Sequence, residues 1–377
     1  MGVDQYKGLL FLVSGVSVFV VMLLTLRLLA LRSSDSSVSD DEDAWLGAED
    51  LEIVDIVEET PDVKSFKLRR LEGKVFPPFR GGQFLSFQIN GDPSVARSYS
   101  LSSPQQNREV VQVSVKRLKD GVGSNWFHQR RIGDHVKAFA PSGHFVDENE
   151  GDQVRVFIAG GIGITPVFSM LTSHLEGARG VEIHLFYGAR TQVDLAFHGM
   201  LSYLASRHEK FHYHPILSRE PDWPGDKGRL TMDFILSKIG EVSDQYFYLC
   251  GPDPMVEPIL DALDQSSLPE EHIFTEQFVA SDAFDDSQIP EREVMVRWLG
   301  IEMAYKGRQN LLSFLEQQGQ FLPSACRSGV CGSCKCRIEG DYTMLTKAGL
   351  TRQEQKQGYA LACVSFPDAD VDIKPIV

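Results

Sequence analysis

The chain has 377 residues, of which 42% are hydrophobic and 24% are charged, a composition typical of globular proteins. It is too long for a single hydrophobic core, so we expect two or three domains. Its formal net charge of −15 argues against nucleic acid as a partner, because a nucleic-acid binder needs a basic face to neutralise phosphates.

The N-terminal segment predicts a membrane anchor. Residues 8–26 carry no charge and would span roughly 29 Å as a helix, close to the thickness of a bilayer core. Apolar residues after Arg27 extend this run, so we expect a transmembrane helix over residues 8–31. A cleaved signal peptide is the alternative, but the apolar stretch is long and no clear cleavage site follows it.

The rest of the chain divides by composition and pattern. Residues 32–50 are rich in acids and serine and predict a solvated tether. Alternating β-rich runs over residues 51–150 predict a small antiparallel barrel. Buried-type strands alternate with helix-like stretches over residues 151–278, which is the pattern of a parallel α/β sheet. A second acidic linker, residues 279–291, leads to a compact unit over residues 292–377.

The cysteine spacing in this last unit predicts a metal cluster. Cys326, Cys331 and Cys334 form a C-x₄-C-x₂-C pattern, and Cys363 follows in a strand-like segment. This is the plant-type spacing for a [2Fe–2S] cluster, with these four thiolates as the ligands. A structural zinc site is the alternative, but such sites usually pair C-x₂-C with a second short pair, which is missing here. Cys336 is expected to be a thiol outside the ligand set.

Residues 293–373 resemble a plant-type ferredoxin domain. CRSGVCGSC resembles the cluster loop of that family, and LTRQEQKQGYALACVSFPDADVDI resembles its closing stretch. The resemblance implies an α+β domain with the β-grasp fold. The expected fold class is therefore multidomain: a transmembrane helix, an antiparallel β-barrel, an α/β domain with a parallel sheet, and a β-grasp domain.

Three further motifs lie between the two acidic linkers. RSYS (residues 97–100) follows a strand and a turn. GGIGITP (residues 160–166) stands between a strand and a helix, where glycines let the backbone approach a pyrophosphate. CGPDPM (residues 250–255) ends another strand. Because ligands of parallel sheets bind outside the carboxyl ends of the strands, the last two motifs should open on one crevice.

The order of these motifs over residues 51–278 resembles the ferredoxin–NADP⁺ reductase superfamily, and the resemblance implies roles for them. Arg97 would hold the flavin phosphate and Ser98 would lie against the flavin N5. The residues expected to bind the flavin are Arg97, Ser98, Tyr99, Ser100, Lys116, Gly121, Gly123 and Ser124. Those expected to bind the nicotinamide nucleotide are Gly161, Gly163, Thr165, Pro166, Arg190, Cys250, Gly251, Pro252 and Met255.

The same resemblance implies catalytic roles for Ser98, for Cys250 close to the hydride-bearing carbon, and for Glu276 at the border of the flavin. An ordinary buried cysteine is the alternative for Cys250, because free cysteine is among the most buried residue types. His212 and His214 form no ligand set with a partner that the sequence identifies, so we expect them at the surface.

The cofactors follow from the same motifs. FAD is preferred to FMN because residues 121–124 (GVGS) resemble a pyrophosphate-binding segment, and FMN has no pyrophosphate. NADH is preferred to NADPH because Arg190 is a single base where a 2′-phosphate pocket would need several. A hydride carries two electrons whereas the cluster accepts one, and a flavin converts between the two.

The expected function is that of an NAD(P)H-dependent oxidoreductase that passes electrons through FAD and the [2Fe–2S] cluster to a separate one-electron acceptor protein. The order of reductase and ferredoxin resembles reductase components of oxygenases and of the hybrid-cluster protein. An oxygenase, a desaturase or the hybrid-cluster protein would be the acceptor, and a membrane-bound acceptor would account for the anchor. The alternatives are a respiratory membrane subunit that reduces a quinone or carrier, and a redox sensor. The expected location is the cell inner membrane, single-pass, with the catalytic body facing the cytoplasm.

Overall fold

The computed structural model describes residues 45, 47–92, 95–177, 180–278 and 289–376. The expected transmembrane helix and most of both acidic linkers lie outside these residues. Among the residues that are described, no helix combines the length and apolarity needed to cross a membrane. These described residues form one compact unit.

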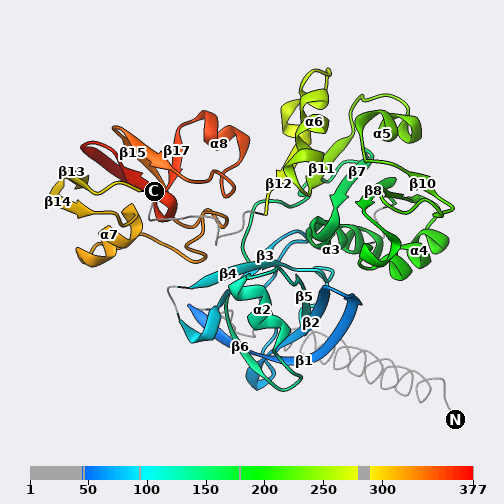
Figure 1. Cartoon of the computed structure of the whole chain (residues 1–377), viewed down its shortest axis with the longest axis horizontal. Coiled ribbons are helices and arrows are strands. Elements are labelled where there is room, and N and C mark those ends of the chain that lie inside the picture. Colours follow the sequence, from blue (N-terminus) through cyan, green and yellow to red (C-terminus); the bar gives the residue numbers. More distant parts are fainter. Residues whose placement is uncertain (1–44, 46, 93–94, 178–179, 279–288, 377) are drawn as a thin grey trace, which may run out of the picture. The chain divides into compact units, whose positions relative to one another are not determined.

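The first part of this unit is an antiparallel β-barrel (Figure 1). Its strands are β1 (Ala48–Thr60), β2 (Val63–Arg70), β3 (Phe84–Gln88), β4 (Ala96–Ser100), β5 (Val110–Lys116) and β6 (His135–Phe139), in the order β4-β3-β6-β1-β2-β5. A bridge between Leu101 and Val113 joins the two edge strands and closes the barrel. Closure removes the unpaired strand edges that would otherwise invite aggregation. The helix α2 (Val122–His128) inserts Phe127 into the barrel core.

The barrel core is built by the alternation of the strands, which turns every second side chain inward. Phe66, Phe87 and Phe127 are fully buried and meet at ring-centroid distances of 4.9 and 5.2 Å. At the start of the described chain, Trp45 lies against the barrel, with its ring 5.6 Å from Phe76 and beneath the guanidinium of Arg70. The amino-terminal end of this unit is therefore held by a packed aromatic side chain.

The second part is a parallel sheet with helices on both faces. Its strands are β7 (Arg155–Gly160), β8 (Ile183–Ala189), β9 (Phe211–Leu217), β10 (Asp226–Lys227), β11 (Tyr246–Cys250) and β12 (Ile273–Glu276), in the order β10-β9-β8-β7-β11-β12. The helices α3 (Ile164–Glu176) and α4 (His198–Arg207) contribute to one apolar cluster, and α5 (Met232–Ile239) and α6 (Asp253–Asp264) to the other. Because both faces are covered, the strands read as near-continuous apolar runs.

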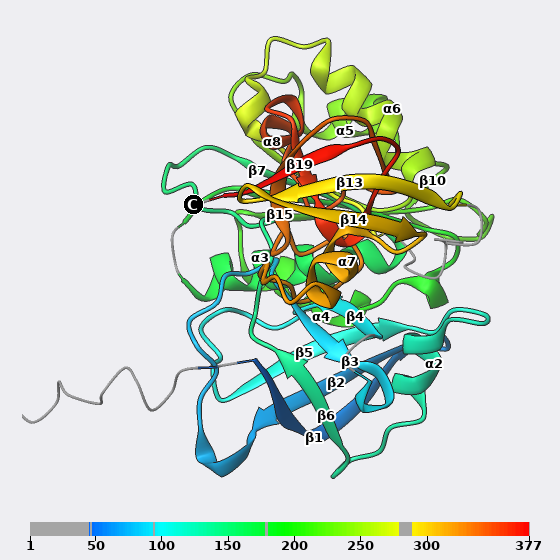
Figure 2. The ribbon, with the colours of Figure 1, turned by 90° about the vertical axis from the view of Figure 1, so that its left-hand side faces the viewer.

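The third part is an α+β domain around a five-stranded sheet (Figure 2). Its strands are β13 (Arg292–Trp298), β14 (Ile301–Gly307), β15 (Lys335–Glu339), β17 (Tyr359–Leu361) and β19 (Val371–Pro375), and a two-stranded sheet pairs β16 (Tyr342–Met344) with β18 (Ser365–Pro367). The helix α7 (Leu311–Gln317) begins at Asn310, whose side chain accepts a hydrogen bond from the amide of Ser313. The short helix α8 (Arg352–Lys356) begins with a capping box between Thr351 and Glu354.

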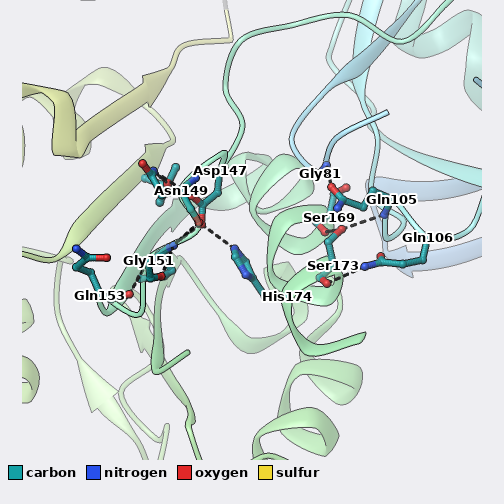
Figure 3. Close-up of polar contacts among 12 residues, drawn as sticks. Gly81, Gln105, Gln106, Asp147, Asn149, Gly151, Gln153, Ser169, Ser173 and His174 are labelled. Atoms are coloured by element: carbon teal, nitrogen blue, oxygen red, sulfur yellow. Dashed lines mark hydrogen bonds and ion pairs between the residues drawn. The ribbon is translucent and has the colours of Figure 1, made fainter. Parts of the chain in front are cut away.

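The segment that leaves the barrel wraps around a buried arginine (Figure 3). Arg155 is fully buried and donates to Asp147 at 2.6 Å, to the carbonyl of Asn149 at 2.7 Å and to that of Gly151 at 3.1 Å. His174 of α3 lies 2.8 Å from the same carboxylate oxygen of Asp147. Burial alone would raise the pKa of Asp147, but hydrogen bonds from these partners and from Tyr248 hold it well below its usual range.

Hydrogen bonds also join the barrel to α3 (Figure 3). The hydroxyl of Ser173 accepts from the amide of Gln105 at 2.9 Å, and its carbonyl accepts from the side chain of Gln106 at 3.0 Å. The hydroxyl of Ser169 donates to the carbonyl of Ser103 at 2.6 Å. These contacts fasten the middle of α3, the helix that follows the GGIGITP motif, to the barrel. The expected barrel, parallel α/β domain and α+β domain are thus confirmed.

Candidate functional site

A cavity lies where the barrel strand β4, the start of α2 and the end of β12 come together. It contains ≈ 1110 Å³ of space between atoms, part of it open to solvent. Its lining includes many of the residues predicted from sequence, namely Arg97, Ser98, Tyr99, Ser100, Lys116, Gly121, Gly123, Ser124, Thr165 and Glu276. Sequence reasoning missed Phe84, Leu118, Ser328, Val330 and Ala348, which also line it.

One end of the cavity is a cradle between β4 and α2. A Cβ atom at Gly123 would lie 2.6 Å from Cγ of Arg97 and 2.8 Å from the hydroxyl of Tyr99, so only glycine allows this approach. The hydroxyl of Ser124 accepts from the amide of Leu118 at 3.1 Å and fixes the loop before the helix. The tight backbone and the adjacent guanidinium fit the phosphates of a flavin dinucleotide.

The floor of the cavity is set by barrel packing. The hydroxyls of Ser98 and Ser86 lie 2.9 Å apart on neighbouring strands. The ring of Tyr99 meets Phe127 edge-on at 5.0 Å, which holds its plane. Lys116 pairs with Asp62 at 3.3 Å. These residues present a rigid, mixed apolar and polar surface, which is the character of cofactor sites.

The two motifs of the parallel sheet are in direct contact. A Cβ at Gly163 would stand 2.2 Å from the carbonyl oxygen of Cys250, and a Cβ at Gly160 would stand 2.8 Å from Met255 and from Pro252. The structure therefore brings together the ends of β7 and β11, which is where sequence analysis expects one crevice. Pro166 lies buried in the first turn of α3, and the hydroxyl of Thr165 donates to the carbonyl of Ile162 at 3.0 Å. Gly161 accepts from the hydroxyl of Tyr187 at 3.0 Å, and Gly251 approaches Gly160 closely.

Cys250 and Glu276 are neighbours across β11 and β12. The Cys250 thiol is fully buried, and burial, followed by the charge of Glu276, raises its pKa well above the usual value. Glu276 as a whole is half-buried, but its Oε2 atom has no accessible surface and no hydrogen-bond partner among the residues described. Burial raises the pKa of Glu276 to about 8. The raised pKa values favour the protonated form of both groups. An unpartnered carboxyl oxygen beside the cavity can meet a polar group of a ligand.

Arg190 lies elsewhere, at the turn after β8. Its side chain is 56% exposed and pairs with Asp194 at 2.9 Å. The amide of Arg219 donates to its carbonyl oxygen, so a second arginine follows the neighbouring strand β9 at the same edge. Sequence reasoning missed Arg219 because the two residues are far apart in the chain and become neighbours only through strand pairing.

The four expected cluster ligands, Cys326, Cys331, Cys334 and Cys363, are all buried and lie close together. Cys326 and Cys331 pack in one buried cluster, and Cys334 and Cys363 pack in another. Within each pair the pKa of one thiol is lowered and that of the other is raised. Two pairs of sulfurs match the need of a [2Fe–2S] cluster for four thiolates around two irons.

The loop around these sulfurs also fits an anionic cluster. The sulfur of Cys326 accepts amide hydrogens from Ser328 at 3.5 Å, Val330 at 3.4 Å and Cys331 at 3.3 Å. The neighbouring Cys331 thiol is the largest cause that lowers the pKa of Cys326 below its usual value, and the backbone amides add to this effect. Gly329 and Gly332 adopt left-handed backbone angles, with φ of 73° and 72°, that let the loop turn its amides inward.

Cys336 does not belong to either sulfur pair. It is fully buried on β15 opposite Ala360, and burial raises its pKa to about 12. The cluster loop also borders the cavity, because Ser328 and Val330 line it and Phe84 packs with Cys326 and Cys331. The chain thus combines a cavity that fits a flavin, a crevice that fits a nicotinamide nucleotide and a loop with four thiolates. These features together define an NAD(P)H-oxidising flavoprotein with its own iron–sulfur domain.

Comparison with known proteins places this class in a family. Residues 50–146 match the oxidoreductase FAD-binding domain, residues 157–260 the oxidoreductase NAD-binding domain, and residues 298–368 the 2Fe-2S iron-sulfur cluster binding domain. The chain is 28% identical to a glycine betaine monooxygenase reductase subunit of Chromohalobacter salexigens, over 87% of this chain and 95% of that one. It is 30% identical to a 3-ketosteroid-9-alpha-monooxygenase ferredoxin reductase component of Mycobacterium tuberculosis, over 85% and 94%.

Among solved structures, phthalate dioxygenase reductase matches with a TM-score of 0.60 and 26% identity, over 89% of this chain and 99% of that one. The chain therefore belongs to the family of oxidoreductases in which an FAD-binding, an NAD-binding and a 2Fe-2S domain follow one another in a single polypeptide. It is an NAD(P)H-dependent enzyme that uses FAD and a [2Fe–2S] cluster, and it passes electrons to a separate acceptor protein.

The comparisons correct one expectation. The prediction of a single-pass inner-membrane protein is wrong, because the relatives named above, which match over most of the chain, are reductase subunits and components of oxygenases. The helix predicted over residues 8–31 lies outside the described residues, and no described helix could span a bilayer. The prediction relied on the length and apolarity of one segment. These properties determine whether a helix could span a bilayer, but they do not determine where the protein resides.

Proposed function

We propose that this chain is the reductase component of an oxygenase system, which oxidises NADH and supplies electrons one at a time to a separate oxygenase. The observation that carries the proposal is the composition of the cavity wall. RSYS residues of the barrel and Ser328 and Val330 of the cluster loop line the same cavity. A two-electron site and a one-electron centre thus share a boundary within one chain.

The proposed domains are the FAD domain over residues 51–150, the NAD domain over residues 151–278 and the [2Fe–2S] domain over residues 292–377. FAD, when bound, supplies the conversion between two-electron and one-electron transfer. The protein contributes position and electrostatics. Arg97 and the backbone at Gly123 would hold the phosphates, and Ser98 would face the reactive part of the ring.

Cys250 and Glu276 would act at the border between flavin and nicotinamide. Because burial raises the pKa of both groups, it disfavours negative charge where hydride must move. Because Gly163 has no side chain, its backbone can lie directly against the Cys250 carbonyl. This close packing would leave room for the nicotinamide to approach Cys250. Phe84, buried beside the cluster cysteines, would exclude water between the cavity and the cluster.

Rapid mixing of the anaerobic holoprotein with NADH tests the proposal. We expect flavin absorbance to bleach first and cluster absorbance second, with steady turnover when a one-electron acceptor is added. The Cys334→Ser variant should keep the first phase and lose the second. Absence of bleaching with either nicotinamide nucleotide would refute the reductase function, and bleaching without turnover would favour a redox sensor.

We also propose NADH over NADPH as the donor. Asp194 neutralises Arg190 and Glu220 accepts from the amide of Gln192, so two carboxylates stand at the turn where a 2′-phosphate would bind. An acid at this place suits a ribose hydroxyl instead. Arg219 would instead favour NADPH, because a second base at this edge suits a 2′-phosphate. The ratio of the kcat/KM values for NADH and NADPH is therefore the deciding measurement. We expect a preference for NADH of more than tenfold, which Asp194→Ala should reduce, and equal use of NADPH would contradict the proposal.

A further inference from the structure

A cluster of imidazoles and one carboxylate lies in the NAD domain, away from the cavity. Glu182 directly precedes β8, His184 lies within β8, and His212 and His214 lie within the neighbouring strand β9. The parallel register pairs His184 with His212, and Phe186 with His214. Strand pairing therefore brings His184 beside two histidines that are distant from it in the sequence and that were expected to be surface residues.

The distances within this cluster match a metal site. Oε1 of Glu182 lies 3.1 Å from Nε2 of His184 and 3.4 Å from Nε2 of His212. One ligand atom from each of the three residues falls within 4.8 Å of the others. Tetrahedral zinc with bonds of about 2.0–2.1 Å holds its ligand atoms about 3.3 Å apart. We propose that Glu182, His184 and His212 bind a divalent transition metal of the zinc class.

A second histidine orients the first. Nδ1 of His184 lies 3.2 Å from Nε2 of His214, whose ring stacks on Phe186 at 4.7 Å. A hydrogen bond from Nδ1–H of His184 to this nitrogen leaves Nε2 of His184 without a proton, facing Glu182. Metal-binding histidines usually donate their other N–H in this way, so His214 acts as a positioning residue.

The surroundings leave the metal an entry path. The side chain of His184 is only 10% exposed, whereas those of His212 and Glu182 are 40% and 48% exposed. Three protein ligands leave one tetrahedral position for water. The ligands stand at the amino-terminal ends of β8 and β9, whereas Gly161 and Cys250 stand at the carboxyl ends of their strands. The metal would therefore join two strands of the sheet without entering the nucleotide crevice.

Zinc binding by the holoprotein tests the inference, with flavin and iron contents verified so that the cluster cysteines are occupied. Competition with a zinc-sensitive fluorescent chelator measures the affinity. Loss of a group that only hydrogen-bonds to a metal ligand costs about 10–100-fold in metal affinity. Glu182→Gln and His212→Gln, which remove direct ligands at exposed positions, should thus weaken binding by at least about tenfold. His135→Gln, at an exposed histidine on β6, is the matched control and should bind as the unchanged protein does.

His214→Phe tests the positioning role, because it keeps a ring beside Phe186 and removes only the hydrogen bond. It should weaken zinc by about 10–100-fold while flavin reduction by NADH, which also reports folding, stays unchanged. Zinc-edge X-ray absorption should show two imidazoles and oxygen at about 2.0–2.2 Å. Equal affinity in the ligand variants, no zinc binding by the unchanged holoprotein, or sulfur ligands at about 2.3 Å would each overturn the inference.

Discussion

The contact between Gly163 and Cys250 allows a quantitative prediction about hydride transfer. In Gly163→Ala, the new Cβ would stand 2.2 Å from the Cys250 carbonyl oxygen and 2.6 Å from its carbonyl carbon. Real Cβ atoms essentially never come closer than 3.0 Å to such atoms, so the backbone of Cys250 must move by about 0.8 Å. A misplacement of about 1 Å at a reacting centre costs on the order of 100-fold in rate, which corresponds to about 2.7 kcal/mol.

Stopped-flow measurement of flavin reduction at saturating NADH gives the relevant rate constant. We expect a loss on the order of 100-fold in Gly163→Ala with FAD and iron contents unchanged. Gly199→Ala is the matched control, because a Cβ at this glycine of α4 meets no atom within 4 Å, and its rate should equal that of the unchanged protein. A Gly163→Ala enzyme with full cofactor content and a rate within about threefold of normal would show that this backbone contact does not position the nicotinamide.

Three further predictions concern the cluster, the buried carboxyl and the buried charge network. Cys334→Ser should lose iron and sulfide, whereas Cys336→Ser should retain both, as metal analysis of the purified variants will show. The raised pKa of Glu276, about 8 against 4.5, means that its contribution to stability is present below pH 4.5 and lost as the pH rises towards 8. Relative to Glu276→Gln, the free energy of unfolding should therefore fall between pH 5.5 and 8.5 by no more than about 3 kcal/mol, an upper value because the side chain is half-buried. Asp147→Asn leaves the buried Arg155 without its counter-charge and should cost about 3–5 kcal/mol in denaturant unfolding, whereas Glu293→Gln, at an exposed pair with Lys306, should cost less than about 1 kcal/mol.

The parts of the site that sequence predicts well depend on local chain geometry. CRSGVCGSC places three cysteines within nine residues, so one loop brings their sulfurs together whatever surrounds it. The motifs that begin at Gly160 and Cys250 each follow a strand of one parallel sheet, and parallel strands present their carboxyl ends at the same edge. Their contact therefore follows from the secondary structure once the two strands are neighbours.

The parts that sequence missed depend on pairing between distant segments. Phe84 lines the cavity because β3 pairs with β4 in a register that sets it opposite Ser100. The register of β8 and β9 likewise brings His184 beside His212. The sequence around Phe84 or His184 does not indicate these partners, because strand order and register are properties of the whole sheet. The wrong prediction of an inner-membrane location had a different cause, because it rested on the length of one apolar segment.

The wrapping of Arg155 by residues 147–153 has a practical consequence for protein engineering. A segment between two nucleotide-binding units would ordinarily be a natural place to join halves of related enzymes. Here the carbonyls of Asn149, Gly151 and Gln153 and the carboxylate of Asp147 all receive hydrogen bonds from one guanidinium that begins the next strand. A chimera spliced inside this loop would separate donor from acceptors, so functional hybrids require junctions before Asp147 or beyond β7.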